Sequence, residues 1–133
     1  MTTPANVGTI AWVDLTVPDA PAIRDFYQAV TGWSASEVPM GDYSDFSLAP
    51  GPDAAPVAGI CHARGVNAEL PAQWLVYIIV ADLDVSIARC LERGGEVLVG
   101  PKSLGGDNRY CVIRDPAGAV AALFAGTTTQ ASI

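Results

Sequence analysis

Charged residues are scarce in this 133-residue sequence, and the basic ones are outnumbered. Only 16% of the residues are charged while half are hydrophobic, which excludes a disordered tail or a charged linker protein. Seven Lys and Arg stand against 14 Asp and Glu, which gives a formal net charge of −7. Nucleic acids and anionic membranes bind through Lys and Arg, so we expect neither as a partner. A small molecule, cationic or neutral, is compatible with this charge.

Long hydrophobic runs and paired cysteines are missing as well. The longest apolar run, 74–81, has eight residues, whereas a membrane-spanning helix needs about 20. Residues 1–8 contain no Lys, no Arg and no apolar segment of the kind found in signal peptides. Cys61, Cys90 and Cys111 are odd in number and form no Cys-x-x-Cys pair, which favours reduced, buried thiols over disulfides or a zinc site. These absences predict a cytoplasmic protein.

In the first half of the chain, apolar and polar residues first alternate and then follow a helical spacing. Apolar residues alternate through 10–17, which predicts a strand. Asp19 is placed to cap a helix whose first turn contains Pro21 and whose end is marked by Gly32. The spacing within the helix predicts one buried stripe, formed by Ile23, Phe26, Tyr27 and Val30. Turn-rich segments then separate three short strands, expected around 33–37, 43–48 and 56–61.

The second half repeats this order. A strongly apolar strand is predicted at 74–80, and Asp82 caps a second helix that ends at Gly95. The buried face of that helix is expected to carry Leu83, Ile87, Cys90 and Leu91. Strands near 96–99, 110–114 and 119–124 follow, the last two joined by a turn signal at 115–118. An offset of 63 residues places Asp19 on Asp82 and Gly32 on Gly95, which indicates a duplicated βαβββ unit.

Alternation within the first strand of each half assigns its residues to two faces. The faces suited to pack beneath the helices carry Val13, Leu15 and Val17 in one half and Val76, Ile78 and Val80 in the other. The opposite faces carry Trp12, Asp14 and Thr16 in one half and Leu75, Tyr77 and Ile79 in the other. The side chains of these opposite faces must point to a concavity or to solvent.

Several short motifs, taken in order, resemble the vicinal oxygen chelate superfamily, also called glyoxalase/bleomycin-resistance/dioxygenase proteins. They are the strand and cap at 12–19, the second cap at 80–84, the glycine pair at 94–95 and the turn at 115–118. The resemblance covers Gly8 to Gly126. It implies an α+β fold of two tandem βαβββ modules, whose mixed β-sheet curls into a half-open barrel with the helices on the outside. It also implies a single domain over 1–133, with module one at about 8–65 and module two at about 70–126, and a homodimer.

The same resemblance locates the superfamily's metal slots. Metal-dependent members place a His or Gln near the start of each module's first strand and a Glu in each module's last strand. In this sequence the slots fall on Trp12, Leu75, Ala122 and a position near Gly59, with Ala58 and Ile60 as the alternatives one register step away. None of these side chains can bind a divalent cation, which needs carboxylate, imidazole or thiolate ligands. We therefore expect no metal and no other cofactor.

Two side chains of the first strand are candidates for binding a ligand. Trp12 is either an aromatic wall that stacks on a planar or cationic ligand, or a core plug that fills the space of a metal site. Asp14 is a carboxylate in an apolar strand, which is costly to bury unless it is paired. It is either a ligand anchor, an exposed strand residue, or the partner of Arg109 or Arg114 in a salt bridge.

Other candidates lie farther along the chain. Tyr77 offers its hydroxyl either to a ligand or to the backbone, and Leu75 and Ala122 line the same expected pocket. His62, the one histidine of the sequence, is either an end-of-strand residue or a general base. Arg109 ends a loop at 102–109 whose glycines suit a mobile cover or an ordinary hairpin connection.

The function that these residues favour is binding of a small organic molecule in an aromatic pocket without metal, as in bleomycin-resistance proteins. The acidic net charge favours a cationic ligand. The expected ligand contacts are Trp12, Asp14, His62, Leu75, Tyr77, Arg109 and Ala122. The alternative is a metal-independent enzyme that uses Asp14, His62 or Tyr77 for proton transfer. A metal-dependent lyase, isomerase or dioxygenase is disfavoured by the residues at the slots.

Overall fold

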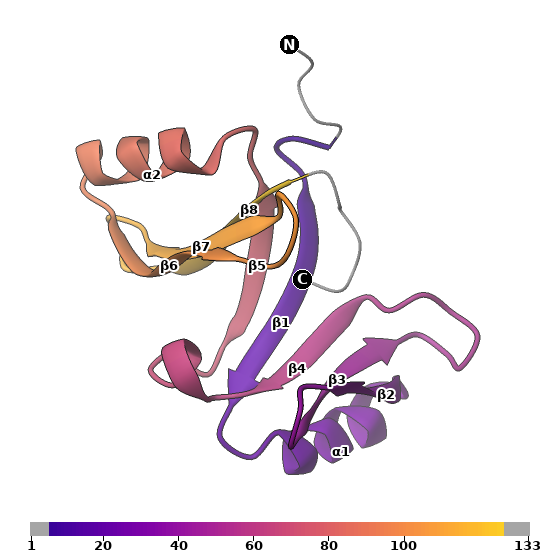
Figure 1. The fold of residues 1–133 in the computed structure, drawn as a ribbon. Helices are drawn as coiled ribbons and strands as arrows, with labels where there is room; N and C mark the ends of the chain where they lie inside the picture. The colour runs from indigo at the N-terminus through magenta and orange to yellow at the C-terminus, as the bar shows by residue number, and fades with distance from the viewer. Residues whose placement is uncertain (1–5, 127–133) are drawn as a thin grey trace. The chain divides into compact units, whose positions relative to one another are not determined.

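The structure, a computed structural model, describes residues 6–126. Along this range the order strand, helix and three strands occurs twice (Figure 1). Module one contains β1 (Ile10–Val17), α1 (Ala20–Thr31), β2 (Ser34–Pro39), β3 (Ser44–Ala49) and β4 (Ala58–His62). After a short 3-10 turn, η1 (Gly65–Asn67), module two contains β5 (Trp74–Ile79), α2 (Leu83–Glu92), β6 (Glu96–Ser103), β7 (Arg109–Arg114) and β8 (Val120–Ala125). The predicted α+β fold with two βαβββ modules is confirmed.

The strands belong to one mixed eight-stranded sheet in the order β2-β3-β4-β1-β5-β8-β7-β6. The chain groups into two compact units that divide β1 between them. Residues 13–74 form one, called here the module-one unit, and the described residues 6–12 and 75–126 form the other, the module-two unit. The order ends at β2 and β6, so the sheet is not closed, and the predicted curl into a half-open barrel is not confirmed. The assignment of 1–133 to one domain stays a prediction.

The core of the module-one unit lies between its strands and α1 (Figure 1). β4 pairs with β1 in parallel and with β3 antiparallel, and β3 pairs in turn with β2. Ile60 is the partner of Leu15 across the first pair and of Phe46 across the second. Because paired residues share a face of the sheet, these three side chains lie together. The core is completed by Val17, Ala20, Leu48 and Ala58.

Helix α1 begins and ends where the sequence predicts. Asp19 accepts a hydrogen bond from the Ala22 N–H at 3.4 Å, and Gly32 takes the left-handed conformation with φ 79°. The predicted buried stripe is wrong in part, because Phe26 is 54% exposed and Val30 is 63% exposed. The helix presents Ile23 and Tyr27 to the core instead.

A contact from Arg24 gives the physical reason for this rotation of α1. Its guanidinium lies 4.6 Å from the ring centroid of Phe46, a cation–π geometry. Arg24 and Ile23 therefore share the face of the helix that meets the sheet, which turns the next residues along the predicted stripe toward solvent. Apolar spacing alone did not reveal that a long basic side chain could cover an aromatic ring.

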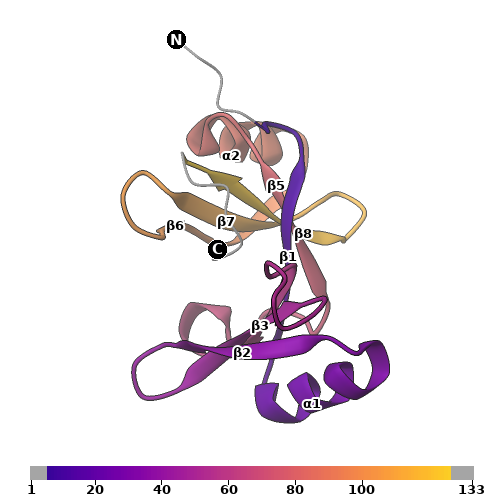
Figure 2. The ribbon, with the colours of Figure 1, turned by 90° about the vertical axis from the view of Figure 1, so that its right-hand side faces the viewer.

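In the module-two unit, α2 packs over the strands of that unit (Figure 2). Asp82 caps the helix by accepting the Val85 N–H at 3.2 Å, as predicted. The core beneath it contains Leu83, Cys111 and Leu123, flanked by Ile78, Val80 and Ile87. Leu91 was predicted to join this face but is 57% exposed, because the face runs through Leu83, Ile87 and Cys90, and Leu91 lies about 100° around the helix from Cys90. The turn at 115–118 is confirmed by the Gly118 N–H, which donates to the Asp115 carbonyl at 2.9 Å.

Candidate functional site

Asp14 lies on the face of the module-one sheet that points away from α1. Its neighbours Leu15 and Val17 belong to the core beneath α1, so the alternation of β1 sends Asp14 and Thr16 to the other side. Asp14 is only 4% exposed, which contradicts the interpretation as an exposed strand residue. A buried carboxylate costs free energy unless it is compensated. Its position therefore calls for interactions that a surface Asp does not need.

Three further polar residues share this face. Thr16 is paired with Cys61 across β1 and β4, and Ser47 is paired with Gly59 across β3 and β4. Asp45 lies two residues before Ser47 on β3, so it points to the same side. We call Asp14, Thr16, Asp45, Ser47 and Cys61 the polar face of the module-one unit.

The pKa of the Cys61 thiol reflects the negative charge of this face. Burial raises the pKa of Cys61 far above its usual value, and the charges of Asp14 and then Asp45 raise it further. The thiol also donates a hydrogen bond to the Asp45 carboxylate. Cys61 therefore stays protonated at neutral pH, which disfavours a role as a thiolate nucleophile. Cys61, Cys90 and Cys111 are all free of disulfides, in agreement with the sequence.

His62, predicted as an end-of-strand residue or a general base, is the last residue of β4. Its ring Nδ1 lies 3.0 Å from Asp45 Oδ1, and its backbone N–H donates to the same oxygen at 2.9 Å. Asp45, which orients His62, was not among the residues predicted from the sequence. The signal was nevertheless present, because an antiparallel pairing of the two predicted strands brings the segments around 45 and 61 together.

Aromatic rings surround the His62 imidazole. Tyr43 meets it edge to face, with ring centroids 5.2 Å apart, and Phe46 lies at 6.3 Å. The guanidinium of Arg64 lies 3.8 Å above the ring of Tyr43, and it approaches the exposed Asp42 at 3.9 Å. The imidazole is thus held between a carboxylate and two aromatic rings while its side chain remains 19% exposed.

The candidates of the module-two unit lie on the face opposite α2. Tyr77 is paired with Ala122 across β5 and β8, and its ring lies 6.3 Å from that of Tyr110. These residues are buried, as are Leu75 and Trp12. The burial of Trp12 is compatible with both the aromatic wall and the core plug. This face is apolar and aromatic, in contrast to the polar face of the module-one unit.

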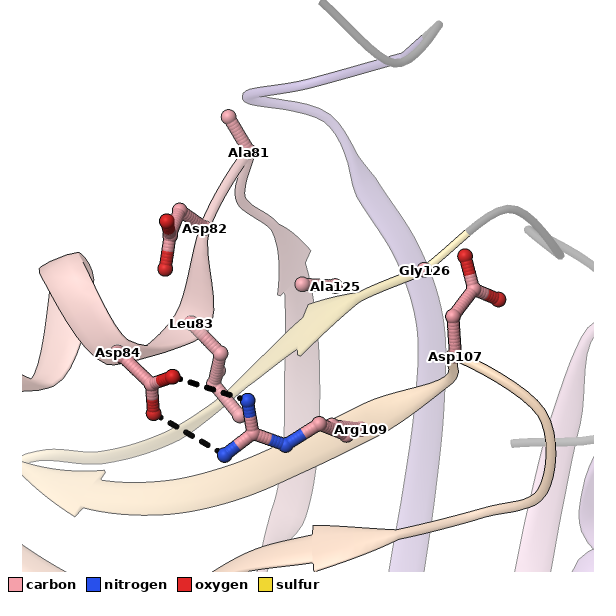
Figure 3. Close-up of a pocket in the computed structure, with 8 residues that line it drawn as sticks. All are labelled: Ala81, Asp82, Leu83, Asp84, Asp107, Arg109, Ala125 and Gly126. Carbon is pink, nitrogen blue, oxygen red and sulfur yellow. Dashed lines mark hydrogen bonds and ion pairs between the residues drawn. The ribbon is translucent and has the colours of Figure 1, made fainter.

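Arg109 lines a hollow of about 330 Å³ in the module-two unit (Figure 3). Its two terminal nitrogens hold the Asp84 carboxylate at 3.0 and 3.1 Å. This bidentate pair lowers the pKa of Asp84 and raises that of Arg109, in each case first through the hydrogen bonds and then through the charge. Arg114 pairs with Glu96 at 3.2 Å. The guanidinium of each arginine thus has a carboxylate partner other than the proposed Asp14.

The slots that the resemblance assigns to the superfamily's metal carry no metal-binding side chain. Trp12, Leu75, Ala122 and Gly59 offer no carboxylate, imidazole or thiolate. Within residues 6–126, no group of three or more His, Cys, Asp or Glu is arranged to hold a metal ion. Over the same range, no helix is both long enough and apolar enough to cross a membrane.

A family model matches most of the chain. Residues 9–123 match the model described as Glyoxalase/Bleomycin resistance protein/Dioxygenase superfamily. The chain belongs to this superfamily. The match covers both βαβββ modules, from β1 into β8, which confirms the resemblance drawn from the short motifs.

Two relatives are anthracycline biosynthesis proteins. DnrV of Streptomyces peucetius is 34% identical over 132 residues, which cover 88% of this chain and 46% of DnrV. DauV of Streptomyces sp. (strain C5) is 33% identical over the same shares. The chain therefore spans about half the length of these relatives.

Solved structures of methylmalonyl-CoA epimerase share the fold. A Streptomyces coelicolor epimerase variant in complex with 2-nitronate-propionyl-CoA superposes with a TM-score of 0.58 at 15% identity, covering 94% of this chain and 99% of that one. Another epimerase structure gives a TM-score of 0.51 at 22% identity, covering 90% and 96%. At these identities the likeness establishes the fold alone.

Proposed function

We propose that this superfamily member binds a small organic cation without a metal ion and that Asp14 is its anchor. The observation that carries the proposal is the burial of Asp14, 4% exposed, on a face that also carries Asp45 and Cys61. A ligand cation would interact favourably with a carboxylate that is already withdrawn from water, because a low local dielectric strengthens the attraction.

The electrostatics of the polar face support a cation over an anion. Asp14 and Asp45 both raise the pKa of the same thiol, so the fields of the two carboxylates overlap at Cys61. A positive ligand would relieve this concentration of negative charge, whereas an anionic ligand would add to it. The net charge of −7 acts in the same direction over a longer range.

An aromatic ring close to Asp14 suits an organic rather than an inorganic cation. Trp12 lies two residues before Asp14 on β1, a separation of about 6–7 Å on the same face of a strand. An indole can cover the apolar body of a ligand while the carboxylate pairs with its charge.

The names of the two relatives suggest a ligand class. Both relatives are named for anthracycline biosynthesis. Anthracyclines are flat polycyclic molecules, and those with an amino sugar also carry a positive charge. Such a molecule combines the aromatic surface that Trp12 could stack on with the ammonium group that Asp14 could pair with. Daunorubicin, which fluoresces, is therefore the probe of choice.

The test is a fluorescence titration of daunorubicin with the wild-type chain and with Asp14→Asn. Removing the charge of a buried anchor should cost about 2–5 kcal/mol of binding, a loss of tenfold or more. Asp53→Asn, which removes the same charge from the exposed loop after β3, is the matched control and should bind as the wild type does. Unchanged affinity in Asp14→Asn would contradict the anchor, and absence of saturable binding to the wild type would contradict the anthracycline-like ligand.

A further inference from the structure

The Asp45–His62 pair has the geometry of a general base held by a carboxylate. Asp45 Oδ1 is 3.0 Å from His62 Nδ1 and also accepts the His62 backbone N–H at 2.9 Å. A carboxylate at Nδ1 selects the neutral tautomer that carries its proton there, which leaves the lone pair on Nε2. The second bond, to the backbone, fixes the carboxylate relative to the strand that carries the imidazole.

The other ring nitrogen is available. The side chain of His62 is 19% exposed, and within residues 6–126 its Nε2 has no hydrogen-bond partner. Tyr43 and Phe46 pack against the ring and restrict its rotation. An imidazole that is fixed, partly open to solvent and free at Nε2 meets the geometric requirements for taking a proton from a bound molecule.

The charged groups around the Asp45–His62 pair are suited to an imidazolium at His62. The Asp45 carboxylate accepts hydrogen bonds from His62 and from Cys61. The imidazolium formed on proton uptake would therefore lie against a negative charge. Asp14, on the same face as Asp45, adds a second carboxylate, and Cys61 stays neutral. Two arginines contact the aromatic rings around the imidazole, Arg64 at the ring of Tyr43 and Arg24 at the ring of Phe46.

We infer that His62 is a general base that removes a proton from carbon in a small organic substrate, with Asp45 as its positioning residue. In this step a substrate C–H bond breaks, the proton moves to Nε2, and the electron pair remains on the substrate as an enolate or expels a leaving group. Return of the proton from Nε2 restores the neutral imidazole. The step needs no oxidant, reductant or metal, and it goes beyond the proposed binding function.

The tautomer is tested first, by nitrogen-15 NMR of the imidazole. His62 is the one histidine of the sequence, so its two ring nitrogens give the only imidazole signals. At a pH where the ring is neutral, Nδ1 should appear as the protonated nitrogen and Nε2 as the acceptor. In Asp45→Asn this preference should weaken or reverse. A wild-type ring with its proton on Nε2 would overturn the inference.

Proton removal itself is tested with 5-nitrobenzisoxazole, an activated carbon acid. A base takes its ring C–H proton, the N–O bond breaks, and a coloured cyanophenolate forms. The wild-type rate should exceed that of an equal concentration of free imidazole by tenfold or more and rise with pH until the imidazole is neutral. His62→Gln should lose most of this excess, and Asp45→Asn a large part of it.

Three controls make the outcome decisive. Lys102→Gln removes the one lysine of the sequence, a side chain that could act as an adventitious base, and should keep the wild-type rate. Asp53→Asn, which removes a carboxylate from the exposed loop after β3, should also keep it. Because the daunorubicin titration and this rate are separate measurements, failure of the proposed ligand anchor and failure of the base are distinguishable. Circular dichroism must show that the His62 and Asp45 variants fold. An excess rate that survives in folded His62→Gln, or no excess over free imidazole in the wild type, would overturn the inference.

Discussion

One carboxylate oxygen of Asp45 lies 3.0 Å from the ring Nδ1 of His62 and accepts the backbone N–H of the same residue, although the two residues lie 17 positions apart in the chain. The antiparallel pairing of β3 with β4 brings them together. The pair therefore joins a chemical feature, a fixed imidazole, to a structural one, the end of β4. Substitutions at Asp45 should affect stability as well as chemistry.

Asp45→Asn should lower the free energy of unfolding by about 1.5–3 kcal/mol. This is the range for hydrogen bonds to a charged group, and here the carboxylate accepts two from His62 and one from Cys61. Asp42→Asn is the control, because the Asp42 side chain is 85% exposed in the preceding turn and its ion pair with Arg64 is long. Urea unfolding of both variants measures the difference, and equal stabilities would contradict a structural role for the Asp45 carboxylate.

Stability should fall as the pH rises above 9, through Cys111. Burial, followed by the charge of Cys90, raises the pKa of Cys111 from 9.0 to about 11. Between these values the unfolded chain loses the thiol proton while the folded chain keeps it, so the folded state binds more protons and alkali favours unfolding. Urea unfolding at pH 8 and pH 10 should show the loss. Cys111→Ala, which removes the titration, should show a smaller loss, and an unchanged slope would contradict this assignment.

Gly95→Ala should destabilise the module-two unit by about 1–3 kcal/mol, the usual cost of overpacking. A Cβ at this position would lie 2.5 Å from the Cys90 sulfur and 3.1 Å from the carbonyl oxygens of Cys90 and Arg114. Two of these three neighbours are backbone atoms and cannot move aside easily. Gly51→Ala is the matched control, because its Cβ would meet nothing within 4 Å and should change stability by less than about 0.5 kcal/mol. Thermal unfolding of the two variants compares them directly.

Sedimentation velocity at micromolar concentration should report twice the mass of one chain. The sheet order leaves β2 and β6 as its outermost strands, and open edges need to be covered. Relatives about twice as long as this chain, DnrV among them, carry further sequence that a second copy of this chain could stand in for. A monomer at these concentrations would contradict the homodimer expected from the superfamily.

Local signals predicted the elements well but not the contacts between them. Asp19 and Asp82 cap their helices and Gly32 ends α1 as expected, because caps depend on a few adjacent residues. The exposure of Phe26 was not predictable from spacing, since it depends on Arg24 lying over Phe46 from a different element. A helical period gives the width of an apolar face but not the rotation of the helix against its sheet.

At the candidate site, too, local signals were predictive whereas contacts between strands were missed. Alternation along β1 predicted that Asp14 and Trp12 share a face, and both are buried. The role of Asp45 was missed because it arises from strand pairing, in which one residue of register decides which side chains meet. His62 was named from its chemistry alone, and only the paired strands supplied its partner.

The division of β1 between the two units bears on how the chain folds. The Gly8 N–H donates to the Ile79 carbonyl at 2.7 Å, and the Ile79 N–H donates to the Thr9 carbonyl at 2.9 Å, so the module-two unit needs residues from before and after module one. Residues 13–74 are continuous and can form their contacts as soon as they leave the ribosome, whereas the other unit must first close a loop that contains all of them. A fragment starting at residue 75 would lack Gly8 and Thr9, which form backbone hydrogen bonds with Ile79 in the full chain. If residues 6–12 were moved to follow module two, through a suitable linker, the module-two unit would no longer have to close a loop around residues 13–74.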